Sequence, residues 1–548
     1  MDKKKILIIH LSRLGDMVQS LPAIKLLKED NPEIRITYLG IEKFCDILTD
    51  VPWIDNLVTL PWQEISTIMR EFNKAGIDAL DRLRETIPEL NEEYDMAINF
   101  THNWSSSYLS EKVKAREKRG RIFSQNNEIA VPGKWGKYLF GMAKNQKDNL
   151  LNLVDMYMGL AGIKNRPTMQ FLPTNPEMDQ KCASQLSDLG FKIGKLSIGF
   201  QLAAGEANRI WRLENFVKLG EHLTEHSDAQ IILFGSERDI ALADQFQTSA
   251  TYPFINLIGQ TTLKELASYL KGIDVLVSSD TGPMHIAAAV GTKVVGIFVG
   301  TAYFGVTAAY GAGHVAVQSN YPCAPCLSTT ACSDPLCRES IKPDTVAQAV
   351  RLALGLEVEL SYLDSEATLY KSAFNPDGTL RYQLITQNTD GFLPWLRLSH
   401  YLKAMVSQTL WNNWLGLNSD NIDPALGKIN GQRKAILADF QQACSAYKDL
   451  YEDGRGLCQK IINEFQKETP NLQLIQVMVE SLRQIEERVK DLEGPLAILK
   501  DVHEFYMAET EICEFPKLAH QFLDKFTALK DIITSFETTL QEIEVSLD

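Results

Sequence analysis

The segment between Asp274 and Thr301 constrains the fold of this chain more than any other. An apolar run at 274–278 leads into the polar turn Asp280-Thr281-Gly282-Pro283, and a small-residue helix follows. A second apolar run at 293–298 then ends in a second polar turn, Gly300-Thr301. This order predicts a βαβ unit of a parallel sheet, with both polar turns at the carboxyl edge, where ligands bind. The amino end of the helix offers unpaired N–H groups that suit a phosphate. The alternative is an ordinary turn in which Asp or Thr caps the helix.

Strand and helix patterns alternate along most of the chain. Strands are predicted at 6–11, 35–39 and 95–100 in a first series, and at 196–201, 230–234, 274–278 and 293–298 in a second. Two consecutive series of this kind predict two doubly wound, Rossmann-like domains that face a cleft. We expect these domains at 1–170, with a helical insertion near 65–90, and at 190–356.

The last part of the chain, 360–548, predicts an α-helical extension. A turn-rich stretch at 374–378 indicates a hairpin between Leu369 and Leu384, and two seams with apolar residues three and four positions apart follow. The seams are Ile475, Met478, Leu482, Ile485, Val489 and Leu492, and then Phe522, Phe526, Leu529, Ile533, Phe536, Leu540, Ile543 and Leu547. Such seams need a partner helix. An all-α bundle within the chain is favoured over an intermolecular coiled coil, which would make a homo-oligomer.

Charge and hydropathy exclude some classes of protein. The chain has 548 residues and a net charge of −15, whereas a nucleic-acid binder would carry a basic footprint. The first apolar run, Ile6–Leu11, is too short for a signal peptide or a membrane span. We therefore expect a cytoplasmic protein with no transmembrane segment, and peripheral binding at the inner face of the inner membrane is the alternative.

Three further positions carry side chains that suit catalysis or anion binding. Asp16 follows the first strand, where a carboxylate either caps the helix or acts as a general base. Arg209 lies in a loop of small residues and offers a guanidinium to an anion, although an exposed loop arginine is often only solvated. Glu237 follows the strand 230–234 and suits either ribose hydroxyls or the cap of the next helix.

Four of the nine cysteines fall within fifteen positions, at Cys323, Cys326, Cys332 and Cys337. Four thiols in a chain without a secretion signal predict a metal site rather than a disulfide framework. Zinc, iron and an iron–sulfur cluster all accept sulfur ligands, and four reduced thiols without metal are the alternative. The cluster lies after the last predicted strand of the second series, away from Asp16, so we expect the metal to be structural.

Several motifs occur in the order found in the family 9 glycosyltransferases, the ADP-heptose-dependent heptosyltransferases, which the chain resembles over about residues 4–356. They are Ile8–Asp16 with Leu21-Pro22-Ala23, Arg209-Ile210-Trp211, Gly235-Ser236-Glu237, and Ser279–His285 with Gly291-Thr292. The resemblance implies a GT-B fold and inverting transfer of heptose, without a catalytic metal, from ADP-heptose to a hydroxyl of a protein or of the lipopolysaccharide core.

The resemblance also implies roles for single residues. Asp16 would deprotonate the acceptor and Arg209 would neutralise the leaving diphosphate. Thr281 and Gly282 would hold phosphates, and Glu237 would hold the ribose. Asp280 and His285 would surround the donor sugar. A helix amino end with one guanidinium suits a leaving group that gains negative charge.

Two departures from the family leave alternatives open. Arg209 stands where the family usually has Lys, and Arg212 stands in place of the proline of the motif Lys-x-Trp-Pro. The extension after residue 360 has no counterpart in the lipopolysaccharide core enzymes. The alternatives are a transferase for another nucleotide sugar and a non-catalytic scaffold that binds nucleotide or senses metal.

Overall fold

The computed structural model forms two compact units. Unit 1 comprises Met1–Thr67 and Leu150–Leu398, and unit 2 comprises Ile68–Asn149 and Ser399–Asp548. The structure describes residues 4–61, 74–123, 129–142, 146, 149–321, 323–326, 332, 335–358, 366–385, 403–404, 406–412, 414–417, 433–467, 469–492, 494–496, 498–508 and 515–547. The units thus divide the chain differently from the boundaries expected at 1–170, 190–356 and 360–548.

The amino-terminal part of unit 1 contains three parallel strands in the order β3-β2-β1, namely β1 (Lys5–His10), β2 (Arg35–Ile41) and β3 (Asn56–Leu60). Helix α1 (Leu14–Asp30) follows β1 directly and packs against α7 (Leu153–Ala161). A short helix, α2 (Glu42–Cys45), follows β2. The residues of β1 after Lys5 are all buried, as expected for a strand of a parallel sheet that is covered on both faces.

The larger sheet of unit 1 has eight strands in the order β10-β9-β8-β11-β12-β13-β14-β15. Their bounds are β8 (Ser197–Gln201), β9 (Gln230–Phe234), β10 (Phe254–Asn256), β11 (Val275–Ser279), β12 (Lys293–Phe298), β13 (Val315–Ser319), β14 (Ala367–Phe374) and β15 (Leu380–Leu384). The strands from β10 to β13 are parallel. The strand order reverses at β8, and such a reversal opens a crevice at the carboxyl ends of the strands.

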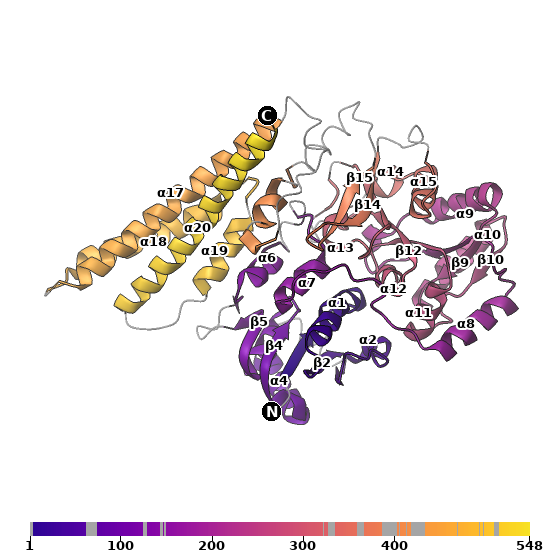
Figure 1. Cartoon of the computed structure of the whole chain (residues 1–548), viewed down its shortest axis with the longest axis horizontal. Helices are drawn as coiled ribbons and strands as arrows, with labels where there is room; N and C mark the ends of the chain where they lie inside the picture. The colour runs from indigo at the N-terminus through magenta and orange to yellow at the C-terminus, as the bar shows by residue number, and fades with distance from the viewer. Residues whose placement is uncertain are drawn as a thin grey trace. The chain divides into compact units, whose positions relative to one another are not determined.

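Helices cover this sheet on two sides (Figure 1). On one side lie α9 (Leu213–Ser227), α10 (Ile240–Ser249) and α15 (Pro343–Ala353). On the other lie α8 (Pro176–Asp188), α11 (Leu263–Lys271) and α12 (Gly282–Val290). Two short helices, α13 (Phe304–Thr307) and α14 (Cys337–Ser340), flank β13 along the chain. Burial of apolar side chains between sheet and helices stabilises the layers, since each buried side chain contributes about 1.5–3 kcal/mol.

The predicted hairpin between Leu369 and Leu384 forms, but it belongs to unit 1. Strand β14 pairs antiparallel with β13 as well as with β15, so the hairpin extends the larger sheet instead of opening the helical extension. The backbone N–H of Leu380 donates to Asp155 Oδ2 in α7 at 2.9 Å. Burial raises the pKa of the Asp155 carboxyl to about 8.

Unit 2 joins a small α/β part to the carboxyl-terminal helices. Its strands are the parallel pair β4 (Glu93–Asn99) and β5 (Lys114–Gly120), and the short pair β6 (Ile122–Phe123) and β7 (Ile129–Ala130). Its shorter helices are α4 (Lys74–Thr86), α5 (Trp104–Lys112) and α6 (Lys134–Met142). Helix α4 is part of the predicted insertion at 65–90, of which residues 65–73 lie outside the described residues.

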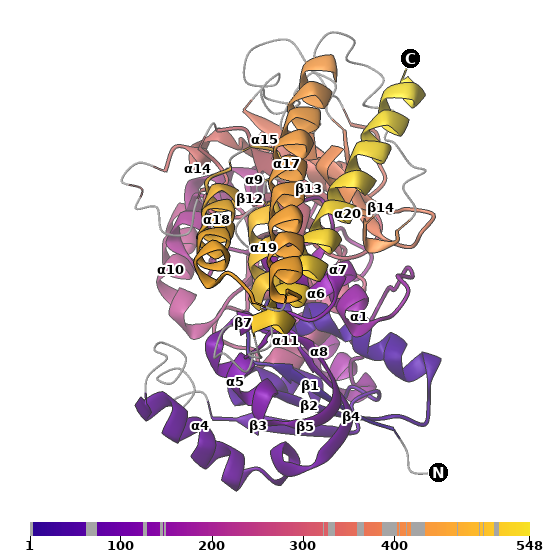
Figure 2. The ribbon, with the colours of Figure 1, turned by 90° about the vertical axis from the view of Figure 1, so that its left-hand side faces the viewer.

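The carboxyl-terminal helices are α17 (Arg433–Phe465), α18 (Leu472–Asp491), α19 (Ile498–Ala508) and α20 (Phe515–Leu547). Helices α17 and α20 run side by side, and α18 packs on α17 (Figure 2). Most residues of the predicted seams, which lie on α18 and α20, are buried, for example Ile475, Val489 and Phe526. The prediction that the seams pack within the chain is therefore confirmed.

Unit 2 owes its compactness to contacts between these helices and the segment 68–149. Helix α19 packs on α6, and the Tyr138 hydroxyl donates to Gln408 Oε1 at 3.0 Å. The Trp411 ring contacts both Tyr138 and Phe536 edge-on or tilted. Among the described residues, no helix has the length and apolar character that would let it cross a bilayer.

Candidate active site

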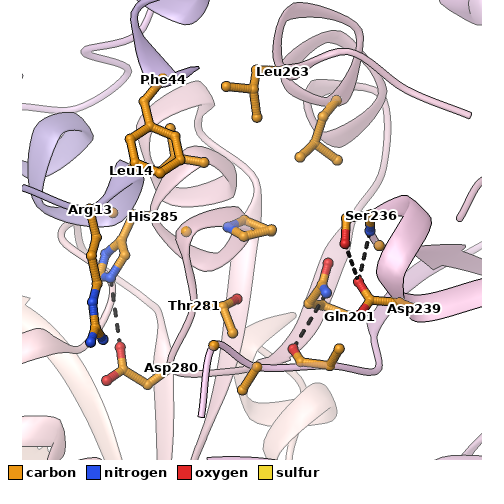
Figure 3. A pocket seen from close by; sticks show the side chains of 18 of the residues that line it. Arg13, Leu14, Phe44, Gln201, Ser236, Asp239, Leu263, Asp280, Thr281 and His285 are labelled. Carbon is orange, nitrogen blue, oxygen red and sulfur yellow. Dashed lines mark hydrogen bonds and ion pairs between the residues drawn. The ribbon is translucent and has the colours of Figure 1, made fainter. Parts of the chain in front are cut away.

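A pocket of about 780 Å³ lies in unit 1, where β8 and β11 end. Its walls come from the loop after β1 with the first turns of α1, from the loops after β8 and β9, and from the first turn of α12. Figure 3 places Arg13 and Leu14 on one side of the pocket, next to His285 and above Asp280. The pocket therefore lies at the switch point of the larger sheet, the place that the sequence predicts for a ligand.

Asp16 lines the pocket from the first turn of α1. The helix begins at Leu14 and its N-cap residue is Arg13, so Asp16 is the third helical residue and the interpretation of Asp16 as the cap is wrong. The Ser12 hydroxyl donates a short hydrogen bond to Asp16 Oδ2. Burial raises the pKa of the Tyr157 hydroxyl well above its ordinary value, and the nearby Asp16 carboxylate raises it further. Asp16 thus combines access to the pocket with a fixed orientation.

Two glycines let the amino ends of α1 and α12 approach each other. A Cβ atom on Gly15 would lie 2.7 Å from Cδ2 of His285, and one on Gly282 would lie 2.9 Å from Cδ2 of Leu14. Both distances are shorter than a side-chain contact tolerates. The absence of these Cβ atoms brings Asp16 and the first turn of α12 to the same pocket.

Arg209 ends a short 3₁₀ turn, Ala207–Arg209, and its side chain is 21% exposed. Its Nε–H donates to Thr301 Oγ1 at 2.6 Å, and its Nη1–H donates to Asp280 Oδ2 at 3.1 Å. Glu206 Oε2 lies 3.5 Å from Arg209 Nε and accepts from the Thr301 hydroxyl at 3.1 Å. Arg209 is therefore held between two carboxylates at the pocket wall, and it is not a freely solvated loop arginine.

Asp280 is the polar centre of this wall, and its side chain is 8% exposed. Besides Arg209, the Thr307 hydroxyl donates to Asp280 Oδ2 at 3.2 Å. His285 Nε2 lies 3.8 Å from Asp280 Oδ1, as the dashed line in Figure 3 marks. Asp280 thereby ties the turn before α12 to Arg209 and to the end of α13.

The first turn of α12 is open to a ligand. Thr281 is its N-cap residue, but the Thr281 side chain makes no cap hydrogen bond and instead lies 3.1 Å from the Ser278 hydroxyl. Pro283 has no N–H group to satisfy. The amino end of α12 faces the pocket at Thr281 and Gly282, so its dipole is directed at whatever the pocket holds.

Glu237 is the exception among the predicted donor-site residues. It is exposed and does not line the pocket, whereas Ser236, Arg238 and Asp239 of the same turn do. Ser236 and Asp239 form a capping box, in which the Asp239 carboxylate accepts from the Ser236 N–H at 2.8 Å. Because Asp239 takes this inward position, the geometry does not support Glu237 as the ribose ligand.

Sequence reasoning missed several pocket residues. Glu206 and Thr307 contact Arg209 or Asp280, and Gln19 and Gln201 line the pocket with buried amide groups. Glu206 could have been predicted as a pocket residue because it lies three positions before Arg209. Gln19 could have been predicted because it lies three positions after Asp16 in the same helix. The sequence offers no comparable signal for Thr307, which reaches Asp280 only through the fold.

The four clustered cysteines lie outside the pocket lining. Cys323 and Cys332 are exposed, Cys326 is half-buried and Cys337 is buried. Burial raises the pKa of the Cys326 thiol to about 11, and the other three thiols raise it further, so the four side chains are near one another. Across the part of the chain that the structure describes, however, no three Cys, His, Asp or Glu side chains converge as a metal site.

Together the pocket residues offer a carboxylate base, a fixed guanidinium and a helix amino end. A base near one end and positive charge near the other suit a displacement whose leaving group is an anion. This arrangement contains no redox group or nucleophilic triad among the residues that line it.

Comparisons with known proteins agree with this chemistry. Residues 83–336 match the model of glycosyltransferase family 9 (heptosyltransferase). The lipooligosaccharide heptosyltransferase 2 of Haemophilus ducreyi is 28% identical over 301 residues, which cover 52% of this chain and 80% of that protein. The lipopolysaccharide core heptosyltransferase OpsX of Haemophilus influenzae is 22% identical over 300 residues, which cover 54% and 79%.

Among solved structures, a family 9 glycosyl transferase from Veillonella parvula has the same fold. It is superimposed with a TM-score of 0.50 at 19% identity, over 65% of this chain and 98% of that one. The larger helices after residue 400 lie beyond the matched range 83–336, as does Asp16. The fold is of the GT-B type with an added helical region. Over residues 83–336 the chain is therefore similar to glycosyltransferase family 9, the heptosyltransferases.

Proposed function

We propose that this chain transfers heptose from ADP-heptose to an acceptor hydroxyl, with inversion at the anomeric carbon. The observation that carries the proposal is the convergence of Asp16, Arg209, Asp280 and the amino end of α12 on one pocket. The match of residues 83–336 to a glycosyltransferase family model supports glycosyl transfer. The names of the relatives support heptose as the sugar and a lipopolysaccharide core as the first acceptor to assay. A protein acceptor stays a prediction.

In the proposed reaction, Asp16 accepts the proton of the acceptor hydroxyl as its oxygen attacks the anomeric carbon. The bond from that carbon to the diphosphate breaks, and ADP leaves with the electron pair. Arg209 and the amino end of α12 stabilise the charge that gathers on the diphosphate. A single displacement from the side of Asp16 inverts the configuration and needs no covalent intermediate on the protein.

Asp16→Asn tests the assignment of the base. The amide keeps the size of the carboxylate but accepts no proton, so turnover is expected to fall by about 100-fold or more. The affinity for ADP, measured by calorimetry, is expected to stay within about twofold, because Asp16 does not contact the diphosphate in this scheme. A folded Asp16→Asn protein with the turnover of the original would remove Asp16 from the reaction.

We also propose that the four clustered cysteines hold a structural metal ion. The proposal is supported by the four sulfur donors and by the short distances between the thiols that their mutual effect on the pKa of Cys326 indicates. Among the described residues, the thiols do not form a complete metal site. A bound cation would deprotonate the thiols and fix the loop that carries them. Elemental analysis of chelator-free protein is expected to find zinc or iron, and the double substitution Cys323→Ser with Cys326→Ser is expected to lose it. Metal-free protein with unchanged stability would favour four plain thiols.

A further inference from the structure

The pocket lining includes the buried side-chain amide of Gln19. Gln19 is 1% exposed, and it lines the pocket from the second turn of α1. Among the described residues, neither its Nε2 nor its Oε1 has a hydrogen-bond partner. A buried amide that lacks all its hydrogen bonds is costly, so natural proteins retain one mainly where a ligand or water completes it.

The position of Gln19 relative to Asp16 indicates which group of a ligand Gln19 would contact. Residues three apart on a helix lie on the same face, about 4.5 Å apart along the axis. Gln19 therefore lies one turn beyond Asp16, farther from the amino end of α1, where Leu14 meets Gly282 of α12. In the proposed reaction the diphosphate lies at Arg209 and the amino end of α12, which places Gln19 toward the group that reacts at Asp16.

Gln201 and His285 also line the pocket, each with a polar side-chain atom that has no partner among the described residues. His285 of α12 is 5% exposed, and its Nδ1 has no partner among the described residues, while its Nε2 faces Asp280. Helices α1 and α12 pack directly on each other, with Gly15 against the His285 ring. An uncharged amide and an imidazole nitrogen, both buried and both unpaired among the described residues, match the donor and acceptor of a sugar hydroxyl better than an anion or an apolar group.

We propose that Gln19 is a specificity-determining residue that binds a hydroxyl group of the sugar at the reacting centre. This inference rests on the proposed function and deepens it. The amide can donate two hydrogen bonds and accept two, so it recognises a hydroxyl in either orientation. A sugar without the hydroxyl would leave the amide unpaired in the complex, and such a loss discriminates strongly between substrates.

The test is Gln19→Leu, which keeps the approximate volume and removes both unpaired polar atoms. The melting temperature is expected to stay the same or rise, since an unsatisfied buried amide is lost. Binding of ADP alone is expected to be unchanged, whereas either the affinity for ADP-heptose falls about 10-fold or the KM of the acceptor rises about 10-fold. The first result assigns the hydroxyl to the donor sugar and the second assigns it to the acceptor. Gln19→Met serves as a second apolar variant in case Leu impairs folding.

The matched control is Thr345→Val, which removes another fully buried, unpaired polar group from α15, away from the pocket lining. It is expected to leave every binding and kinetic constant unchanged. Unchanged constants in both Gln19 variants would overturn the inference, because Gln19 would then bind only a structural water. Failure of the original protein to bind ADP-heptose would instead overturn the proposed function, and the inference with it.

Discussion

Replacement of Arg209 by alanine should weaken ADP binding by roughly two orders of magnitude. Within the described chain, the guanidinium uses its Nε–H for Thr301 and one Nη1–H for Asp280, which leaves further donors for an oxygen of the diphosphate. A hydrogen bond between charged groups contributes about 1.5–3 kcal/mol, or about 10- to 150-fold in Kd.

The structure favours the upper end of that range. Asp280 and Glu206 flank the guanidinium at 3.1 and 3.5 Å, so its removal leaves two carboxylates beside the site of a diphosphate. Their repulsion adds to the lost attraction. The second substitution Asp280→Asn removes part of this repulsion, and the double variant is expected to bind ADP more tightly than Arg209→Ala alone.

Isothermal calorimetry with ADP at fixed ionic strength measures these affinities. Arg166→Ala is the control, because Arg166 pairs with Asp30 outside the pocket and its loss changes the net charge by the same amount. An ADP affinity of Arg209→Ala within about twofold of the original, in a folded protein, would refute the role of Arg209. An unaltered affinity in the double variant relative to Arg209→Ala would refute the repulsion argument.

Two further predictions concern stability and packing. Burial lowers the pKa of His503 to about 4. The contribution of the neutral imidazole to the free energy of unfolding of unit 2 is therefore complete above the ordinary pKa of about 6.5, and it falls by up to about 3 kcal/mol as the pH drops to 4. His503→Phe should remove that part of the loss, and identical pH profiles in thermal unfolding would contradict it. Gly15→Ala should lower the free energy of unfolding by about 1–3 kcal/mol and also lower turnover, because the added Cβ would clash with the His285 ring. An unchanged melting temperature and turnover would show that α1 and α12 are not in close contact at Gly15.

The sequence predicted the elements of unit 1 well because their patterns are local. The strands at 230–234 and 293–298 have the predicted bounds. Buried apolar runs between turn residues encode such strands directly. The edge strand β10, with three residues, carried too little pattern to be recognised.

The parts that sequence reasoning could not place depend on long-range contacts. The hairpin was recognised, but its pairing with β13 depends on residues about fifty positions apart. The packing of the carboxyl-terminal helices on the segment 68–149 likewise has no local signature. In the site, the sequence predicted that Glu237 faces the ligand, whereas Asp239 lines the pocket. The sequence alone does not show which of these two acidic residues points inward, because that depends on the capping box.

The central claim is that this pocket transfers a sugar from an adenosine diphosphate donor. In the most direct test, the wild-type protein and Asp16→Asn are each incubated with a lipopolysaccharide core acceptor and with ADP-heptose, ADP-glucose or a uridine diphosphate sugar. Nucleotide release and the mass of the acceptor are then measured. We expect the wild-type protein, but not Asp16→Asn, to release ADP and to add one heptose to the acceptor. Transfer from a uridine nucleotide instead, or equal transfer by Asp16→Asn, would contradict it.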